Sequence, residues 1–150
     1  MGKAKFVVIY LLAGMSGNVL SCLVNPRMPA VGASGAIFGM VGAWGAFCIM
    51  NQSAMGAENA QRSLAAVGQT LAFNLFLGMS SSQIDNMGHV GGFLGGAIAT
   101  FFIGPRLKRR WNPLTGESYT VDTSPRLSIP RFGREGSSRS QETSMERPWP

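Results

Sequence analysis

Histidine and cysteine are scarce in this 150-residue chain, which contains one His and two Cys. Cys22 and Cys48 both fall within apolar segments, and this placement indicates neither a disulfide framework nor a set of zinc ligands. The chain has a single histidine, His89, and none of the expected membrane spans contains an acidic residue that could bind a metal ion together with it. We therefore expect no metal site.

Charged side chains are almost absent from residues 6–104, which hold four of them: Arg27, Glu58, Arg62 and Asp85. So little charge over so long a stretch is typical of membrane segments. The net charge of +6 comes mainly from outside this stretch. A basic cluster follows the last apolar run and is not interleaved with aromatics, which favours a juxtamembrane anchor over nucleic-acid binding: Arg106, Lys108, Arg109 and Arg110.

Four apolar segments are expected to be membrane helices: residues 6–24, 34–50, 64–79 and 87–103. At 1.5 Å per residue they span roughly 24 to 28 Å, slightly less than a hydrocarbon layer of about 30 Å. Gln69, Thr70 and Asn74 interrupt the third segment, which should therefore face other helices or a wet cavity. The predicted fold is all-α, a polytopic bundle of four transmembrane helices.

The domain boundary is expected near residue 110. Residues 1–110 form the predicted transmembrane domain. Residues 111–150 are rich in proline and serine with little apolar periodicity, so we predict a disordered, basic and polar tail, with a short extended piece around 119–121.

Charge placement predicts the orientation of the bundle. Four spans return the chain to its starting side, so three hydrophilic segments share one compartment and bring seven basic residues there: Lys3, Lys5, Arg62, Arg106, Lys108, Arg109 and Arg110. The opposite side has Arg27 alone. This asymmetry follows the positive-inside rule and places Ser34 and His89 near the same, outer face.

Small residues recur at helical spacing in the second and fourth segments. They are Gly35, Gly39, Gly42 and Gly45 in one, and Gly88, Gly92 and Gly96 in the other. Glycine permits close backbone approach, a principal source of packing energy between helices in lipid. These two helices are predicted to pack against each other.

Ser34 begins the second segment within Gly32-Ala33-Ser34-Gly35. A serine hydroxyl needs a base to become a nucleophile, and the N-terminus of a helix offers unpaired N–H groups to an oxyanion. Gly32 and Gly35 permit a tight turn and a close substrate approach. By itself, however, this short pattern also arises by chance in a glycine- and serine-rich chain.

His89 lies near the start of the fourth segment, and an imidazole at membrane depth needs a partner. It is a candidate general base; the alternative is a structural histidine that donates to a carbonyl. Phe38, one turn after Ser34, can stack against the imidazole or pack as an ordinary core residue. Asp85 precedes His89 and is expected to cap the fourth helix rather than complete a triad.

These residues resemble those of rhomboid intramembrane serine proteases. Gly32-Ala33-Ser34-Gly35 followed by Ala36-Ile37-Phe38-Gly39 is similar to the nucleophile helix of that family, and Asn86-x-Gly-His89-x-Gly-Gly92 to its histidine helix. The resemblance covers residues 6–110, from the family's third transmembrane helix to its sixth. The stretches 84–86 and 104–105 are most similar to the cyanobacterial and plastid branch.

The resemblance implies an integral, multi-pass protein of a plastid or bacterial inner membrane that cleaves single-pass transmembrane proteins without a cofactor. It makes Ser34 the nucleophile and His89 the base, with the backbone N–H groups of Ala33 and Ser34 at the oxyanion. It assigns supporting roles to Gly32, Gly35, Phe38, Asn86 and Gly92.

The resemblance also implies a difference from the family, whose six-helix core carries an oxyanion-assisting His and Asn on a second helix that precedes the matched region. One alternative is therefore a truncated, inactive rhomboid-like protein that binds transmembrane helices. Another is that residues 1–22 are a signal sequence, because Lys3 and Lys5 precede an apolar run.

Overall fold

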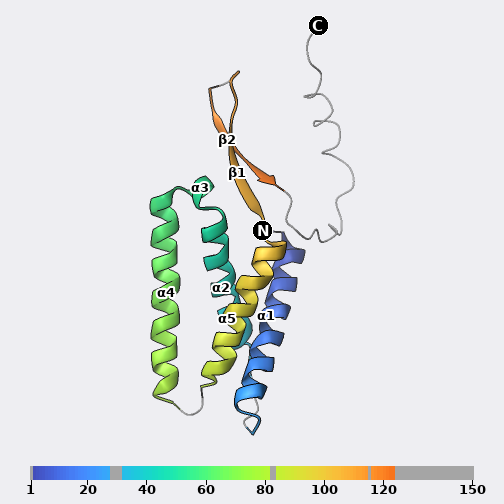
Figure 1. The fold of residues 1–150 in the computed structure, drawn as a ribbon, viewed down its shortest axis with the longest axis vertical. Helices are drawn as coiled ribbons and strands as arrows, with labels where there is room; N and C mark the ends of the chain where they lie inside the picture. The colour runs from blue at the N-terminus through green and yellow to red at the C-terminus, as the bar shows by residue number, and fades with distance from the viewer. Residues whose placement is uncertain (1, 28–31, 82–83, 115, 124–150) are drawn as a thin grey trace.

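The computed structural model describes residues 2–27, 32–81, 84–114 and 116–123. Over these residues the chain forms a helical bundle from whose end a two-stranded hairpin extends (Figure 1). The helices are α1 (Lys3–Val24), α2 (Ser34–Met50), α3 (Gln52–Met55), α4 (Ala57–Met79) and α5 (Asn86–Ile103). The strands are β1 (Arg106–Trp111) and β2 (Ser118–Thr123). The expectation of a mostly helical bundle is confirmed, and the expectation of a purely α-helical chain is corrected by the hairpin.

The helix bounds follow the expected segments closely except in α4. This helix begins at Ala57, whereas the apolar segment was expected to start at residue 64. Its first two turns are mostly polar and exposed, apart from the buried Ala60, and they include an ion pair between Arg62 and Glu58 at 2.6 Å. Gly56, with a φ of 88°, makes the turn before it. Apolar residues alone could not indicate these turns, because opposite charges four residues apart stabilise an exposed helix without burial.

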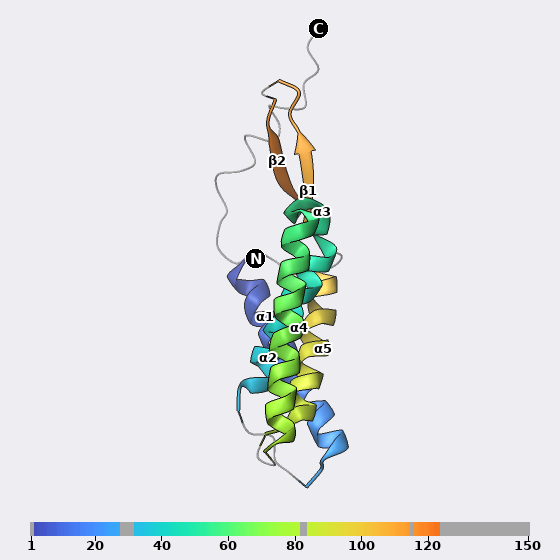
Figure 2. The same cartoon turned by 90° about the vertical axis from the view of Figure 1, so that its left-hand side faces the viewer.

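Helices α1, α2 and α5 pack against one another, and α4 lies beside α2 on the other side (Figures 1 and 2). The contact between α2 and α5 is the most extensive of them. A Cβ atom at Gly42 would overlap the Phe93 carbonyl, and one at Gly96 would overlap the Gly39 carbonyl. The predicted close packing of these two helices through glycine is therefore confirmed.

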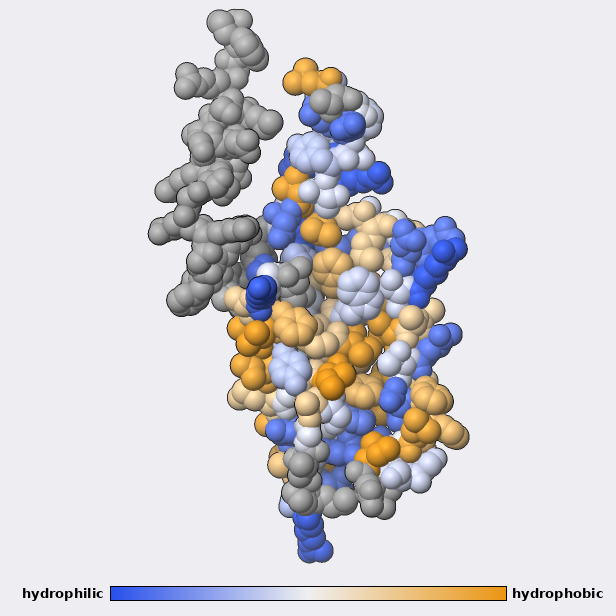
Figure 3. Space-filling view, turned by 180° about the vertical axis from the view of Figure 1, so that it is seen from behind, coloured by the Kyte–Doolittle hydropathy of each residue, from blue (hydrophilic) through white to orange (hydrophobic). Residues whose placement is uncertain are grey.

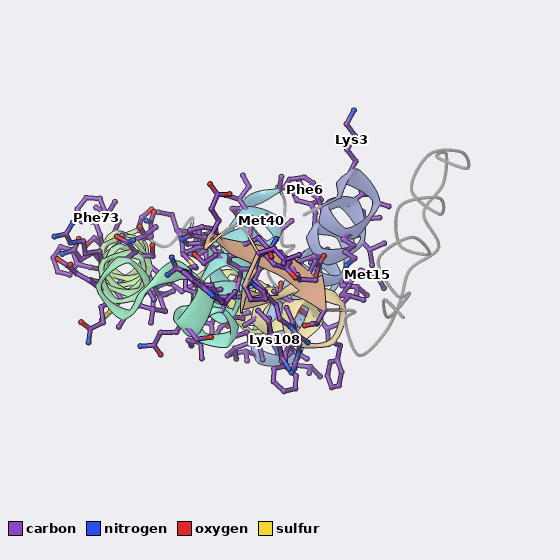
Figure 4. All side chains as sticks on the ribbon, turned by 90° about the horizontal axis from the view of Figure 1, so that it is seen from above. Lys3, Phe6, Met15, Met40, Phe73 and Lys108 are labelled. Carbon is purple, nitrogen blue, oxygen red and sulfur yellow. The ribbon has the colours of Figure 1, made fainter. Side chains whose placement is uncertain are left out.

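The outer surface of the bundle is rich in apolar side chains. Seen from behind, they spread over the middle of the molecule, while hydrophilic residues gather toward its two ends (Figure 3). Figure 4 shows Phe73 projecting outward from α4, where it is 62% exposed. Among the described helices, α1 is long and apolar enough to cross a membrane, and α2 is a shorter apolar helix.

The hairpin β1–β2 is antiparallel, with Arg106 opposite Thr123 and Trp111 opposite Ser118. A turn closed by Asn112 connects the strands: its side chain accepts from the Leu114 amide at 2.9 Å. A disordered tail was predicted from residue 111 onward. Strand β1 crosses the expected boundary at residue 110, and the expected extended piece at 119–121 lies in β2. The predicted tail over 124–150 lies outside the described residues.

Asn51 attaches the hairpin to the helical bundle. It follows α2, is fully buried, and donates from Nδ2 to the carbonyls of Phe47 at 2.8 Å and Pro105 at 3.2 Å. Its Oδ1 accepts from the Leu107 amide at 2.5 Å. One side chain thus satisfies backbone groups at the end of α2 and at the start of β1.

Replacing Asn51 with alanine should release the base of the hairpin. The change leaves the Leu107 amide and the Pro105 carbonyl without their partner, and we expect Leu107 to exchange its amide hydrogen about 30-fold faster, which corresponds to about 2 kcal/mol. Hydrogen-exchange mass spectrometry measures this rate. Asn59→Ala is the matched control, because the Asn59 side chain is exposed on α4 and donates to the nearby Met55 carbonyl, at the end of α3, at 3.2 Å. Equal protection of Leu107 in both variants would contradict the role of Asn51.

Candidate active site

Two helices begin at the same end of the bundle, opposite to the hairpin (Figure 2). Ser34 is the first residue of α2 and is exposed, and His89 lies in the first turn of α5. Before α2, Gly32 has a φ of 122°, a conformation that side chains other than glycine rarely adopt. This conformation is compatible with the tight turn that the sequence predicts before Ser34.

The starts of α2 and α5 touch through glycine. A Cβ atom at Gly35 would lie 3.2 Å from the Gly88 carbonyl oxygen, and a Cβ atom at Gly92 would overlap the Gly35 carbonyl. Because Gly35 follows Ser34 and Gly88 precedes His89, this contact joins the two turns that carry the candidate nucleophile and base. The close contact between Gly35 and Gly92 that the family resemblance implied is confirmed.

Phe38 stacks on His89, as expected from their positions in the sequence. The ring centroids are 4.2 Å apart and the planes are inclined by 14°. Both side chains are buried, with 7% of each exposed. This stack fixes the plane of the imidazole by contact with a neighbouring helix.

Asp85 caps α5, as predicted. Its side chain accepts from the Gly88 amide at 2.9 Å, so the carboxylate is engaged with the helix backbone. The Nδ1 atom of His89 is buried and has no hydrogen-bond partner among the described residues. In the part of the chain that the structure describes, the imidazole is therefore oriented by an aromatic ring and by helix packing, with no carboxylate bonded to it.

The Ser34 hydroxyl makes no hydrogen bond to His89 within the described ranges. The structure brings together the helix turns that carry them and leaves the two reactive groups unbonded. Catalytic hydrogen bonds are often long in enzymes without substrate and tighten in the complex. The arrangement thus has an exposed hydroxyl at the N-terminus of a helix, where backbone N–H groups lack intrahelical acceptors, beside a helix that presents an imidazole.

Asn86 holds α5 against α4. Its Nδ2 donates to the Leu75 carbonyl at 3.4 Å, and its side chain fills the space that a Cβ atom at Gly78 would need. Its Oδ1 is buried without a partner among the described residues. Asn86 therefore contacts the neighbouring helix rather than Ser34.

Helix α1 supports the back of the site, which sequence reasoning missed. Ser16 Oγ donates to the Gly91 carbonyl at 2.8 Å, and a Cβ atom at Gly17 would lie 2.7 Å from the Gly88 carbonyl oxygen. The small residues of α1 thus lie directly against the turn that carries His89. Their spacing, with Gly14 one turn before Gly17, was the signal available in the sequence.

Potential metal ligands are not grouped in the described parts of the chain, where no three His, Cys, Asp or Glu side chains come together. Cys22 is exposed, Cys48 is buried, and both are free.

Comparison with known proteins identifies the family. A family model, the Rhomboid domain, matches residues 1–106. The chain is 36% identical over 107 residues to Rhomboid protease GluP of Bacillus subtilis (strain 168). The matched region covers 69% of this chain and 19% of that protein. RHOMBOID-like protein 7 of Arabidopsis thaliana is 33% identical over 102 residues, covering 68% of this chain and 32% of the relative. RHOMBOID-like protein 2 of the same plant is 36% identical over 110 residues, covering 73% of this chain and 34% of the relative.

The chain therefore spans between 19% and 34% of the length of these three relatives. No solved structure matches it. The family model covers more than two thirds of the chain and includes all four long helices, with both Ser34 and His89. The chain belongs to the rhomboid family of membrane-integral proteases.

Proposed function

We propose that this chain carries the catalytic dyad of an intramembrane serine endopeptidase that cleaves transmembrane segments of membrane proteins. The observation that supports this proposal most directly is the stacking of Phe38 on His89, because Phe38 lies one helical turn after Ser34 in α2. It is joined by the glycine contact between the starts of α2 and α5. The names of the relatives, among them a rhomboid protease, point to the same reaction.

In the proposed reaction, Ser34 Oγ attacks the scissile carbonyl carbon while His89 takes the hydroxyl proton. The backbone N–H groups of Ala33 and Ser34, at the start of α2, donate to the oxyanion of the tetrahedral intermediate. His89 then gives the proton to the leaving amine, and an acyl-enzyme remains. Water, deprotonated by the same imidazole, hydrolyses the ester and regenerates Ser34.

Phe38 takes the place of a carboxylate in this scheme. A general base must be held in one orientation, and a stacked ring supplies that constraint by van der Waals contact. Asp85 does not compete for the role, because its carboxylate binds the Gly88 amide. The dyad is thus a Ser and a His with aromatic support.

We further propose that α1, α2, α4 and α5 all cross the bilayer. Apolar side chains are exposed on each of them, for example Leu11, Trp44, Phe73 and Leu94. An apolar surface of this extent is unfavourable in water and favourable in lipid. The seven basic residues that were predicted to share one compartment lie in the segments at the hairpin end of the bundle. Arg27 lies beyond the opposite end of α1 (Figure 1). The positive-inside rule then puts Ser34 and His89 on the outer side.

A second candidate function is the binding of transmembrane helices without cleavage. The absence of a hydrogen bond between Ser34 and His89 in the described residues favours it, with His89 Nδ1 buried and without a partner there. Apolar helices with small residues would still bind other helices.

Labelling with a fluorophosphonate separates the two functions. The full chain, reconstituted in liposomes, should form a stable adduct at Ser34, because the probe reacts only with a serine that a base activates. Ser34→Ala should abolish the adduct, as read by fluorescence in a gel and by mass spectrometry. Ser80→Ala is the matched control, since Ser80 is an exposed serine at the same end of the bundle, after α4. A folded wild-type chain that takes up no label would favour the binding function.

A further inference from the structure

An apolar groove lies at the hairpin end of the bundle, away from Ser34. It has a volume of about 340 Å³ and lies between the last turns of α2 and α5. Its walls include Ile49, Met50, Ala97, Ile98, Phe101 and Phe102. The groove extends over only one to two turns of each helix, which is short for a partner helix that would pack along a whole seam.

A cationic edge stands at the mouth of this groove. The Arg106 guanidinium lies over the ring of Phe101, one of the groove residues, at 5.6 Å from its centroid. Because side chains alternate along a strand, Arg106, Lys108 and Arg110 share one face of β1. Seen from above, Lys108 lies on the α5 side of the bundle, whereas Lys3 projects beyond α1 (Figure 4).

Within the two strands no acidic side chain shares that face, and Glu117 lies in the turn before β2, at the end of the hairpin away from the groove. The residues of β2 opposite these cations are Thr123, Val121 and Tyr119, and Asp122 lies opposite Leu107 on the other face. Arg109, also on that other face, donates from Nε to Ser118 Oγ at 3.1 Å. The positive charge beside the groove is therefore not neutralised by the hairpin itself.

The geometry points to a binding site for one anionic phospholipid, with an acyl chain in the groove and the phosphate on Arg106 and Lys108. Successive residues of a strand advance about 3.3 Å, so Lys108 lies about 7 Å beyond Arg106, within reach of a headgroup layer roughly 5 to 8 Å thick. Arg110, at about 13 Å, lies beyond that layer. Basic pockets between transmembrane helices on the positive side bind anionic headgroups in this manner.

This site rests on the proposed membrane arrangement, but it uses none of the residues of the proposed dyad. It gives the hairpin a function as well: Asn51 and Arg106 hold β1 over the ends of α2 and α5. The occupant has both charge and shape complementarity, because the cations meet the phosphate and the wholly apolar walls meet the chain.

Photocrosslinking tests the site. The full chain is placed in phosphatidylcholine nanodiscs with a small fraction of phosphatidylglycerol that carries a diazirine on one acyl chain, and adducts are located by mass spectrometry. We expect adducts concentrated on Ile98, Phe101 and Phe102, and we expect unlabelled phosphatidylglycerol to compete better than phosphatidylcholine. Evenly spread adducts, or equal competition by the two lipids, would overturn the proposal.

Two pairs of variants sharpen the test. Arg106→Gln with Lys108→Gln should reduce the headgroup preference about 25-fold, or about fivefold for each cation. Lys3→Gln with Lys5→Gln removes the same charge at the same end of the bundle and should leave the preference unchanged. Ala97→Leu should fill the groove and suppress the adducts, while Ala72→Leu, on the exposed surface of α4, should not.

The same samples distinguish this proposal from the protease function. If fluorophosphonate fails to label Ser34 while the lipid adducts remain in the groove, the lipid site stands and the catalytic proposal falls. If Ser34 is labelled and the groove residues crosslink instead to a second copy or to a transmembrane peptide, the lipid site is overturned.

Discussion

His89→Gln should lower the rate of fluorophosphonate labelling and of peptide hydrolysis by about 10⁶-fold, as far as Ser34→Ala lowers hydrolysis. The two residues act as one unit in the proposed mechanism, because a serine without its base is scarcely nucleophilic. The double variant should therefore be no slower at hydrolysis than either single variant. Hydrolysis is measured with a single-pass model substrate in liposomes. Labelling needs no natural substrate and is measured as a time course of fluorophosphonate incorporation.

Phe38→Leu is the graded comparison for this experiment. It keeps the imidazole and removes the ring stacked on it at 4.2 Å, an interaction worth about 0.5 to 1.5 kcal/mol. We expect a loss of about two- to tenfold, provided that the helical content measured by circular dichroism is unchanged. If His89→Gln were no more impaired than Phe38→Leu, the imidazole would be a structural group and the dyad would be excluded.

The parts of the fold that the sequence predicts well are those that depend on small residues and apolar runs. Gly39, Gly42 and Gly96 leave faces with no side-chain volume, and the physics of helix contact in lipid then leaves few alternatives to close packing. The position of Asp85 three residues before Gly88 likewise indicates the observed cap. Both inferences depend on neighbours within one or two turns.

The parts that escaped prediction depend on distant partners. Strand β1 carries four basic residues and no clear alternation of apolar and polar side chains. Its pairing depends on partners in β2, which range from Ser118 opposite Trp111 to Thr123 opposite Arg106. Asn51 bonds to the Pro105 carbonyl and to the Leu107 amide, which lie 54 and 56 residues later in the chain. Such bonds have no local signature in the sequence.

The candidate site was predictable in composition but only partly in geometry. The sequence places Ser34 and His89 at equal depth, and the contact of Gly35 with Gly88 shows that their helix turns meet. The position of α1 behind His89 was not foreseen, because the sequence does not show which helix Ser16 and Gly17 face. What a small residue does on a helix depends on which neighbour it faces.

Gly92→Ala should disrupt both the bundle and the site. A methyl group there would overlap the Gly35 carbonyl, a backbone atom that cannot rotate aside, so α2 and α5 must separate. Overpacking of this kind costs about 1 to 3 kcal/mol. The displacement also moves His89 relative to Ser34, and a shift of about 1 Å can lower a catalysed rate about 100-fold. Unfolding in mixed micelles with increasing SDS, followed by circular dichroism, measures the first effect, and fluorophosphonate labelling measures the second.

Gly68→Ala is the matched control, because it makes the same chemical change in another helix of the bundle, where the surroundings differ. A Cβ atom at Gly68 on α4 meets no atom within 4 Å. Alanine is about 1 kcal/mol more favourable than glycine within a helix, so this variant should be at least as stable as the wild type and equally reactive. If Gly92→Ala behaved in the same way as Gly68→Ala, the backbone contact between α2 and α5 would be absent from the folded protein. The proposed dyad would then lose its structural basis, because that contact is what brings the turns of Ser34 and His89 together.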